Sequence, residues 1–564
     1  MIAARNTPNA GRADDTQRIQ DAINACGTGH AVRLAIANGM SAFVSGALVL
    51  KSGVTLVLDV GVTLFATTDP HAYDRGQKSC GTNNTTGKGC RPFITADRTR
   101  GSGIMGDGVI DGQGGQLIDG KMESWWQIAR RAQKEQTRQN VPRLIEISNS
   151  TDFNLYRITL RNSPNFHVTL NRVDGFTAWG VKIDTPADAR NTDGIDPISS
   201  RNVTIAHSFI RTGDDNVAIK AGGNGPTENI SILHNHFYNG HGMSIGSETN
   251  GGVRNVLVEN LTMEGATSGL RIKSDVSRGG HVSNVRYRHV CLTNVRAPLD
   301  IDTRYDKKAA GNKIPAYRDI VFEHVRSMTP GRIILRGFNS ARPLMATLND
   351  VVIDGNPMMQ IEHAKLVLGP GPVQPLPAGD DAEVSGSPSN GPGKSCDGAF
   401  VPFPILPALS SSKRPQLTSH DAETYSYTNV LKTTGQAGSE SSDPWDPLSD
   451  PLATGATLKT NYIVDAATTA TGKTVFKTVQ AAVNRAVSEQ AASGSQDRIF
   501  IHVKPGIYRE LLYVPPMTAP ITLVGFDANA AHTVISANLD ALVVGSKYSQ
   551  SFGAQFASAP PEIT

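Results

Sequence analysis

The sequence predicts an all-β protein whose main part is a right-handed parallel β-helix. Short strand-like segments recur along the chain, and no helical pattern accompanies each repeat. Glycine is abundant, with 55 residues in 564, while aromatic residues make up only 6%. A repeat of this size with several short strands suits a β-helix. Leucine-rich repeats would need a leucine framework that is absent, and propeller blades would need a longer period.

The repeated segments alternate apolar and polar residues, as a strand with one buried face does. They begin at Phe153, Phe176, Val203, Ile230, Val256, Val285, Ile320 and Val351. The successive intervals are 23, 27, 27, 26, 29, 35 and 31 residues. Each interval therefore measures one predicted coil of the solenoid.

Asparagine or aspartate stands before many of these strands, at Asn202, Asn229, Asn255, Asn284, Asp319 and Asp350. Stacked asparagine side chains can hydrogen-bond from one coil to the next. The ordinary preference of these residues for turns explains the pattern equally well. Both interpretations stay open from the sequence.

The chain is predicted to have three parts. Residues 1–406 form the β-helix, and an amphipathic helix at 15–26 covers its open N-terminal end. Residues 407–459 are a Ser/Thr/Pro/Gly-rich linker. Residues 460–564 are the start of a second, incomplete parallel β-helix. The first residues lack a basic stretch followed by an apolar one, so no secretory signal is predicted there.

Composition excludes several classes of protein. Lys and Arg number 54 against 51 Asp and Glu, a net charge of +3, so a nucleic-acid partner is not expected. No apolar run approaches 18 residues, so no membrane span is expected. Hydrophobic residues make up 39%, enough for a large core rather than a disordered chain. We expect a monomer.

Five cysteines are too few for a disulfide scaffold, and their spacing fits no zinc site. Cys80 and Cys90 flank a polar loop that one disulfide could close, although two free thiols would also fit the sequence. Cys291 follows an apolar strand pattern and is predicted to be a buried packing residue.

Charged side chains recur at matching positions of adjacent coils. Asp214 lies 11 residues after Val203, and His241 lies 11 residues after Ile230. Parallel neighbours lie about 4.7–4.9 Å apart, so Asp214 and His241 are expected to be close together. Asp215 follows a glycine at a turn, where strict alternation fails, and it can face the same cleft.

The same counting places Lys220, Ser247 and Lys273 in one vertical row. Arg271 stands two residues before Lys273 and therefore shares its face of the strand. Asp193 comes from the preceding coil, whose length differs, so its register is not predicted. One face of the solenoid is thus expected to carry three aspartates, a histidine and three cations.

This combination suits hydrolysis of a glycosidic bond, which needs one protonated carboxyl and one ionised carboxylate. Crowded carboxylates raise one another's pKa and so supply the acid. Nearby Arg and Lys suit the carboxylate of an acidic sugar. Charges spread by chance over a solvated face are the competing interpretation.

Four motifs occur in order: NTDGIDP (191–197), GDDNVAIK (213–220), GHGMSIGS (240–247) and GLRIKSD (269–275). Together they resemble the polygalacturonases of glycoside hydrolase family 28, over roughly residues 12–406. The resemblance implies endo-type hydrolysis of α-1,4-galacturonosyl bonds in pectin or polygalacturonate. It also implies single displacement with inversion, no metal or other cofactor, and an extracellular protein.

The resemblance also implies residue roles. Asp214 would be the general acid, while Asp193 and Asp215 would hold and activate the water. His241 would orient or tune the acid. Four further roles are implied: Arg271 and Lys273 grip the galacturonate carboxylate, Tyr305 contacts the neighbouring subsite, and Asn191, like Lys220, holds the carboxylates.

The last part of the chain resembles the N-terminal part of pectin methylesterases, carbohydrate esterase family 8. The matching residues are VDA (464–466), FKTVQAAV (476–483) and GIYRE (506–510). Such enzymes use aspartates, glutamines and an arginine further along the chain, and no arginine follows Arg509. We therefore expect no esterase activity.

Three other functions compete with hydrolysis of polygalacturonate. A pectate lyase would eliminate rather than hydrolyse, with an Arg base and calcium, which the paired aspartates could bind. A polysaccharide-binding β-helix would need no catalytic motifs. A related hydrolase could act on another acidic polysaccharide such as rhamnogalacturonan.

Overall fold

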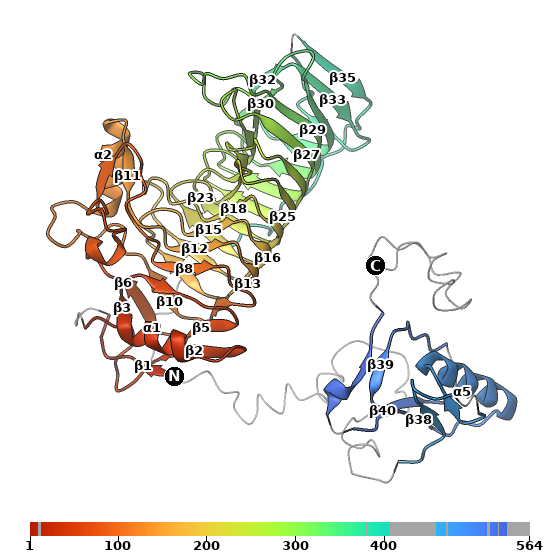
Figure 1. Cartoon of the computed structure of the whole chain (residues 1–564). Helices are drawn as coiled ribbons and strands as arrows, with labels where there is room; N and C mark the ends of the chain where they lie inside the picture. Colours follow the sequence, from red (N-terminus) through yellow and green to blue (C-terminus); the bar gives the residue numbers. More distant parts are fainter. Residues whose placement is uncertain are drawn as a thin grey trace, which may run out of the picture. The chain divides into compact units, whose positions relative to one another are not determined.

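The computed structural model describes residues 1–8, 13–379, 381–404, 458–469, 472–515, 519–527 and 529–537 (Figure 1). Contacts between residues divide the chain into two units, 1–412 and 413–564. The predicted linker, 407–459, lies outside the described residues apart from its last two positions. No described helix is both long and apolar enough to cross a membrane.

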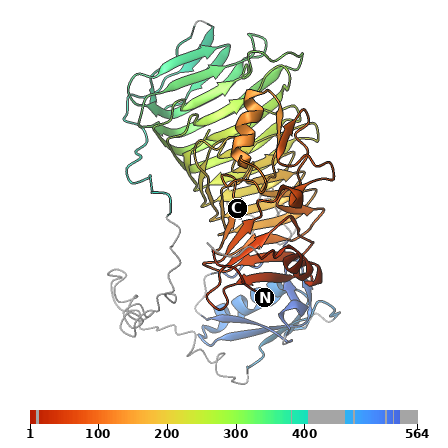
Figure 2. The same cartoon turned by 90° about the vertical axis from the view of Figure 1, so that its left-hand side faces the viewer.

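The first unit is a right-handed parallel β-helix, as predicted. Its coils stack along one axis (Figure 2), and most coils contribute three strands in succession. The first two strands of each coil belong to a 22-stranded sheet, and the third belongs to an 11-stranded sheet.

The first strands of the coils are β1 Ile2–Ala3, β2 His30–Ala35, β5 Val54–Leu58, β9 Gly103–Met105, β13 Thr151–Tyr156, β16 Asp174–Trp179, β19 Arg201–Ala206, β22 Thr227–Leu233, β25 Val253–Glu264, β27 Gly280–Thr293, β29 Pro315–Ser327, β31 Leu344–Ile353, β33 Ala364–Leu368 and β35 Ala382–Gly386. The second strands are β3 Ala42–Ser45, β6 Thr63–Ala66, β10 Val109–Asp111, β14 Thr159–Arg161, β17 Lys182–Asp184, β20 Phe209–Thr212, β23 His236–Asn239 and β34 Val373–Gln374. In four coils the first and second strands are continuous, as β25, β27, β29 and β31. The third strands are β4 Leu48–Val49, β8 Ile94–Asp97, β12 Ile145–Ser148, β15 Val168–Asn171, β18 Ile195–Ile198, β21 Val217–Ile219, β24 Met243–Gly246, β26 Leu270–Lys273, β28 Leu299–Asp302, β30 Arg332–Arg336 and β32 Met358–Glu362.

Inward-facing apolar side chains stack from coil to coil and form one continuous core. In β5, Val54, Leu56 and Leu58 are fully buried, while the residues between them face outward. Phe153 stacks on Phe176 of the next coil, with ring centroids 6.4 Å apart. Stacking like on like in this way removes a large apolar area from water in every coil.

The predicted strand starts are in register from Phe153 to Ile320. The last predicted start is wrong. Ala346 of β31 pairs with Ile320, and Val351 pairs with Val325 instead. Strand β31 begins earlier than expected, and Val351 lies in its second half, opposite the second half of β29.

Asparagine side chains form the ladder that was one of the two open interpretations. Asn229 donates to Asn202, Asn255 to Asn229, and Asn284 to Asn255, with N···O distances of 3.2, 3.0 and 2.9 Å. Asp350 does not continue this ladder, because its carboxylate contacts His324 at 2.6 Å.

Helix α1 (Thr16–Ala25) agrees with the helix predicted at 15–26, and it buries Ile19 and Ile23 in the core. A second helix, α2 (Trp125–Lys134), stands out from the side of the β-helix (Figures 1 and 2). A short 3-10 helix spans Pro70–Tyr73. Strands β7 (Thr82–Asn84) and β11 (Arg138–Asn140) pair antiparallel beside α2.

Two disulfides are formed. Cys80 and Cys90 are bonded, as one of the two sequence interpretations proposed. The prediction for Cys291 as a simple packing residue is wrong, because it is bonded to Cys396 across a separation of 105 residues. Cys291 is nevertheless buried. The segment around Cys396 runs back along the outer side of the coils, where the Tyr238 hydroxyl donates to the carbonyl of Val401.

The second unit has a small core around helix α5 (Val479–Ser493). Its sheet contains β36 Tyr462–Val464, β37 Val475–Phe476, β38 Ile499–Val503 and β40 Ile521–Gly525, while β39 Gly506–Tyr508 pairs with β41 Thr533–Ile535; a 3-10 helix spans Ala530–His532. All these pairs are parallel. Parallel pairing agrees with the predicted start of a second β-helix, whereas the likeness to an esterase stays a prediction.

Candidate active site

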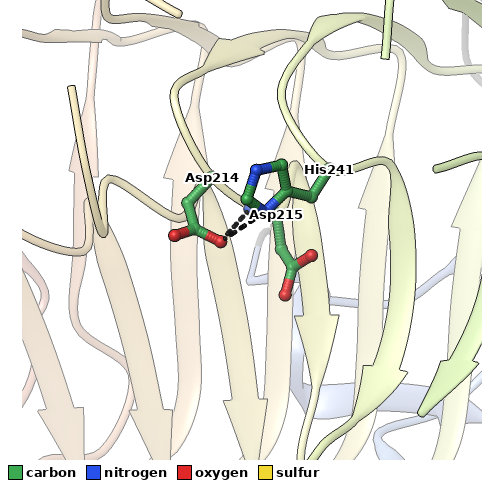
Figure 3. A group of neighbouring side chains, drawn as sticks. All are labelled: Asp214, Asp215 and His241. Carbon is green, nitrogen blue, oxygen red and sulfur yellow. Dashed lines mark hydrogen bonds and ion pairs between the residues drawn. The ribbon is translucent and has the colours of Figure 1, made fainter. Parts of the chain in front are cut away.

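The charged residues gather where the second strand of each coil turns into the third. Asp214 and Asp215 lie between β20 and β21, and His241 lies between β23 and β24 of the next coil (Figure 3). Gly240 allows this close packing: a Cβ there would lie 2.5 Å from the carbonyl oxygen of Asp214, and its φ is +69°. A bulkier residue at 240 would therefore push the two coils apart.

One expected row needs correction. Lys220 and Lys273 do share a row, but Gly246 lies between them and Ser247 does not. The coils have similar total lengths but divide their residues differently among the turns. Counting from the first strand therefore slipped by one residue at the third.

Asp214 and His241 form the pair that the repeat predicted. The Nδ1 of His241 lies 3.0 Å from Oδ1 of Asp214, and Figure 3 shows the ring facing this carboxylate. Asn191 donates to the other carboxylate oxygen at 3.4 Å. The Asp214 side chain is 17% exposed and that of His241 is 37% exposed, so both reach solvent.

Asp215 is held by cations from the coil after next. Lys273 Nζ donates to its Oδ2 at 2.7 Å, and Arg271 Nη1 lies 3.7 Å from its Oδ1. The hydroxyl of Ser244 donates to the same Oδ1 at 2.7 Å. Arg271 also contacts Asp300 at 3.1 Å.

Lys220 holds two further carboxylates in place, those of Asp193 and Asp196. Its Nζ donates to Oδ2 of Asp193 at 3.1 Å and to Oδ2 of Asp196 at 2.5 Å. The ammonium also lies 4.4 Å from the centre of the Phe166 ring. The second oxygen of Asp193, Oδ1, is buried and has no hydrogen-bond partner among the described residues.

Tyr305 joins the group from a later coil. Its ring centre lies 5.3 Å from the guanidinium carbon of Arg271 and 5.4 Å from Nζ of Lys273. These contacts are cation–π interactions, and 44% of Tyr305 remains exposed. All eight residues that the sequence singled out are thus brought to one region of the surface.

Sequence reasoning missed Asp196, Asp300 and Phe166 as members of this group. Asp196 lies inside the NTDGIDP motif and is fully buried, so the motif itself was the available signal. Asp300 and Phe166 have no signal of this kind. Their place depends on which coil they occupy.

Burial and like charges divide the protons unequally among the carboxyls. Burial first, and then the charge of Asp196, raises the pKa of Asp193 well above its ordinary value. Burial likewise raises the pKa of Asp196. Burial also disfavours ionisation of Asp214, but the hydrogen bond from His241 and the charges of His241 and Lys273 outweigh it, so the Asp214 pKa is lowered. In the ligand-free protein a proton therefore rests more readily on Asp193 than on Asp214.

The two aspartates could also serve as metal ligands. Ligand atoms of Asp214, Asp215 and His241 lie within 4.8 Å of one another. One of these carboxylates, Asp215, already accepts a hydrogen bond from Lys273. A metal cation there would have to compete with the ammonium group of Lys273 for Asp215. This set of ligand atoms therefore fits a resident metal poorly.

Comparison with known proteins agrees with this architecture. A sequence profile described as "Glycosyl hydrolases family 28" matches residues 26–369. An endo-polygalacturonase of Pectobacterium carotovorum subsp. carotovorum is 52% identical over 349 residues, covering 62% of this chain and 86% of the relative. A polygalacturonase of Ralstonia nicotianae is 41% identical over 475 residues, covering 71% of this chain and 89% of the relative. The solved structure of a polygalacturonase from Erwinia carotovora ssp. carotovora superposes with a TM-score of 0.62 at 49% identity. The match covers 64% of this chain and 96% of the solved chain. The chain therefore belongs to glycosyl hydrolases family 28.

Proposed function

We propose that this protein is an endo-polygalacturonase that hydrolyses α-1,4-galacturonosyl bonds by single displacement with inversion. The observation that carries the proposal is the convergence of three carboxyls beside Arg271 and Lys273. An acid, a base and a cationic site for a uronate carboxylate are the parts that this reaction needs. The relatives named endo-polygalacturonase and polygalacturonase support the choice of substrate.

Asp214 protonates the glycosidic oxygen in this proposal. The carboxylate and imidazole of Asp214 and His241 are 3.0 Å apart and can share one proton. The hydrogen bond from His241 and the charges of His241 and Lys273 lower the pKa of Asp214, so its carboxylate is ionised in the ligand-free protein. In the proposed step a proton first moves across the 3.0 Å contact to Asp214, which passes it to the leaving oxygen as negative charge develops there.

Asp193 and Asp215 hold and activate the water. The free Oδ1 of Asp193 is a buried acceptor with no partner among the described residues, and such an atom suits a bound water. Lys273 fixes the direction of the Asp215 carboxylate through its 2.7 Å hydrogen bond. The raised pKa of Asp193 makes it a stronger base once it loses its proton.

The substrate carboxylate is bound by Arg271 and Lys273, and the exposed ring of Tyr305 packs on the neighbouring sugar. Arg271 is paired with Asp300 in the ligand-free protein, so the substrate must compete for part of its hydrogen-bonding capacity. Asn191 and Lys220 act by holding Asp214 and Asp193 in place. None of these steps uses a metal.

Two product measurements test the proposal together. Proton NMR of the first products from polygalacturonate should show the β-anomer at the new reducing end, because inversion of an α-linkage produces it. Viscosity should fall much faster than reducing ends accumulate, because internal cleavage shortens chains quickly. The α-anomer would contradict inversion, and release of mono- or disaccharides without loss of viscosity would contradict the endo mode.

We further infer that the protein acts outside the cell as a monomer. Its two disulfides are typical of exported proteins. Size-exclusion chromatography with light scattering measures the mass, and a dimer would contradict the inference.

The second unit contributes no esterase activity in this proposal. Two of its acidic residues make structural bonds: Glu510 accepts from the backbone N–H of Val479 and Gln480 at the start of α5, and Asp465 pairs with Lys504. Methanol released from methylated pectin by the purified protein would contradict this.

A further inference from the structure

A buried amide lies between the two turns that carry Asp214 and His241 on neighbouring coils (Figure 3). It belongs to Asn216, which stands directly before β21 and is 0% exposed. None of the roles assigned above uses Asn216. Burying an amide costs free energy unless its polar atoms find partners, so its contacts show what it holds together.

The Asn216 side chain joins two coils. Its Nδ2 donates to the carbonyl of Ile210 at 3.0 Å, within its own coil, and to the carbonyl of Tyr238 in the next coil at 3.3 Å. Its Oδ1 accepts from the backbone N–H of Gly242 at 3.0 Å. The backbone N–H of Asn216 donates in return to the carbonyl of Gly242 at 3.1 Å. Every polar atom of the side chain is therefore used.

The partners of this amide bracket the proposed acid and its histidine. Ile210 and the amide itself lie on either side of Asp214 along the chain. Tyr238 and Gly242 lie on either side of His241. The two turns also meet directly, because the N–H of His241 donates to the carbonyl of Asp214 at 2.9 Å. One side chain thus fixes the ends of both turns.

The imidazole of His241 depends on this support of its backbone. Among the described residues, Asp214 is the one polar partner of the ring, 3.0 Å from its Nδ1. The side chain of His241 is 37% exposed, so packing constrains the ring only on part of its surface. Its direction is therefore set mainly by the backbone at residue 241. A misplacement of about 1 Å can cost about 10²-fold in rate.

The surroundings of Asn216 require this particular side chain. Two carbonyl oxygens face its Nδ2 and one N–H faces its Oδ1, so the position needs two donors and an acceptor in a single short group. Aspartate has the same shape but lacks the two donors, and leucine lacks all three groups. A Cβ at Gly240 would lie 2.9 Å from the same Oδ1, so the amide is closely surrounded.

We propose that Asn216 is a positioning residue for the acid pair: its amide locks the turns of two neighbouring coils together and so holds the His241 ring in line with Asp214. Asn216 is buried beneath the site and acts through the imidazole, without contact with the substrate. This inference rests on the proposed function, in which Asp214 is the acid and exchanges its proton with His241.

The test replaces Asn216 with leucine, which has a similar size and no polar side-chain atom, in the full chain. We expect kcat on polygalacturonate to fall about 10²-fold, because the imidazole is no longer held in place. KM should change by less than about threefold, because Arg271 and Lys273 still bind the substrate. A rise in KM with an unchanged kcat would overturn the inference.

A double-mutant cycle separates positioning from general damage to the fold. His241→Ala removes the group through which Asn216 is proposed to act. In that background Asn216→Leu should change kcat by less than about threefold, because no imidazole is left to misplace. A loss as large as the one in the wild-type background would overturn the inference.

Asn235 provides a matched control, because its buried amide joins the same two coils. Its Nδ2 donates to the carbonyl of Ile205 at 2.8 Å, and its Oδ1 accepts from the N–H of Ser208 at 2.9 Å. It lies at the corner before β23, between the first and second strands. Asn235→Leu should lower the urea midpoint, as Asn216→Leu does, but leave kcat unchanged. Equal losses of kcat in the two variants would overturn the inference.

Hydrogen–deuterium exchange tests the lock without any substrate. The N–H groups of His241 and Gly242 both donate across the two turns. Both should exchange faster in Asn216→Leu and at the wild-type rate in Asn235→Leu. Unchanged exchange in Asn216→Leu would overturn the inference. If the protein does not hydrolyse polygalacturonate, the proposed function fails, and the exchange still decides whether Asn216 holds the turns.

A milder variant keeps the inference testable if Asn216→Leu does not fold. Asn216→Asp keeps the acceptor for Gly242 but loses the two amide donors. We expect kcat to fall about tenfold, the effect of roughly one lost hydrogen bond, and the loss to disappear in the His241→Ala background. An unchanged kcat in Asn216→Asp would contradict the role of the amide donors and overturn the inference.

Discussion

Replacing Lys220 with methionine should destabilise the β-helix in a way that depends on pH. Lys220 Nζ contacts Asp193 at 3.1 Å and Asp196 at 2.5 Å, and the side chains of both aspartates are almost completely buried. Methionine fills a similar volume but leaves two carboxyls without their cation. Breaking a buried ion pair from one side costs about 3–5 kcal/mol. We expect a loss of this size in the free energy of unfolding at pH 7.

The sign of the pH dependence follows from the carboxyls. An aspartate whose folded pKa is raised keeps its proton while the unfolded chain has released it, so stability falls as pH rises above the unfolded value. Burial already raises the pKa of Asp193 and of Asp196 in the native protein. Without Lys220, one further carboxyl stays protonated in the folded state. Each pH unit then costs about 1.4 kcal/mol more than in wild type, or roughly 3 kcal/mol between pH 5 and pH 7.

Lys220 itself adds no pH dependence to the free energy of unfolding between about pH 5 and pH 7. Its pKa is raised well above the ordinary value, since the charges of Asp196 and Asp193 outweigh the effect of burial. A raised lysine pKa contributes stability below the unfolded value that is lost only as pH rises through the folded one. Lys220 is therefore charged throughout the experiment.

Urea unfolding at pH 5, 6 and 7 measures the effect. Trp125, Trp126 and Trp179 lie in the first unit, so tryptophan fluorescence reports mainly on that unit. The control is Lys182→Met on β17, since no ion pair of Lys182 is found within the described residues. A loss below about 1 kcal/mol, or one equal at pH 5 and pH 7, would refute the reasoning.

Three further variants test other parts of the structure. Asp214→Asn should lower kcat about 10²–10⁴-fold with little change in KM, and a variant that keeps a tenth of the wild-type rate would exclude Asp214 as the acid. Lys273→Ala should lower kcat at least about tenfold, because it removes the hydrogen bond that orients Asp215; a rise in KM alone would instead mean that Lys273 only binds substrate. Replacing Cys291 and Cys396 with Ser should lower the free energy of unfolding by about 4–5 kcal/mol, because the bond closes a loop of 105 residues. A change below about 1 kcal/mol in urea unfolding would show that other contacts hold this segment.

The sequence predicted the register of the coils well where one buried face had to repeat. Phe153, Phe176 and Val203 stack because a slip of one residue would turn the apolar face outward. Val351 was misplaced because the first and second strands of this coil are continuous in β31, and the segment counted from Val351 is its second half. Where two strands of a coil join, alternation alone does not say which half begins the repeat.

The candidate site could be predicted as a group but not as a set of contacts. Repeat counting brought Asp214 next to His241, yet it misplaced Ser247 because turn lengths vary between coils. The bond between Cys291 and Cys396 depends on a segment that returns along the outside of the helix, and no repeat encodes that path. The direction of each pKa shift likewise depends on burial, which spacing does not give.

Incubation with polygalacturonate in excess EDTA tests the central claim most directly. New reducing ends and unsaturated products are read together from the same samples, with Asp214→Asn as the control. The mechanism from Asp193, Asp214 and Asp215 predicts reducing ends without unsaturation, at an undiminished rate. Unsaturated ends, or activity that returns only with added calcium, would mean elimination instead of hydrolysis and would contradict the roles given to these three aspartates.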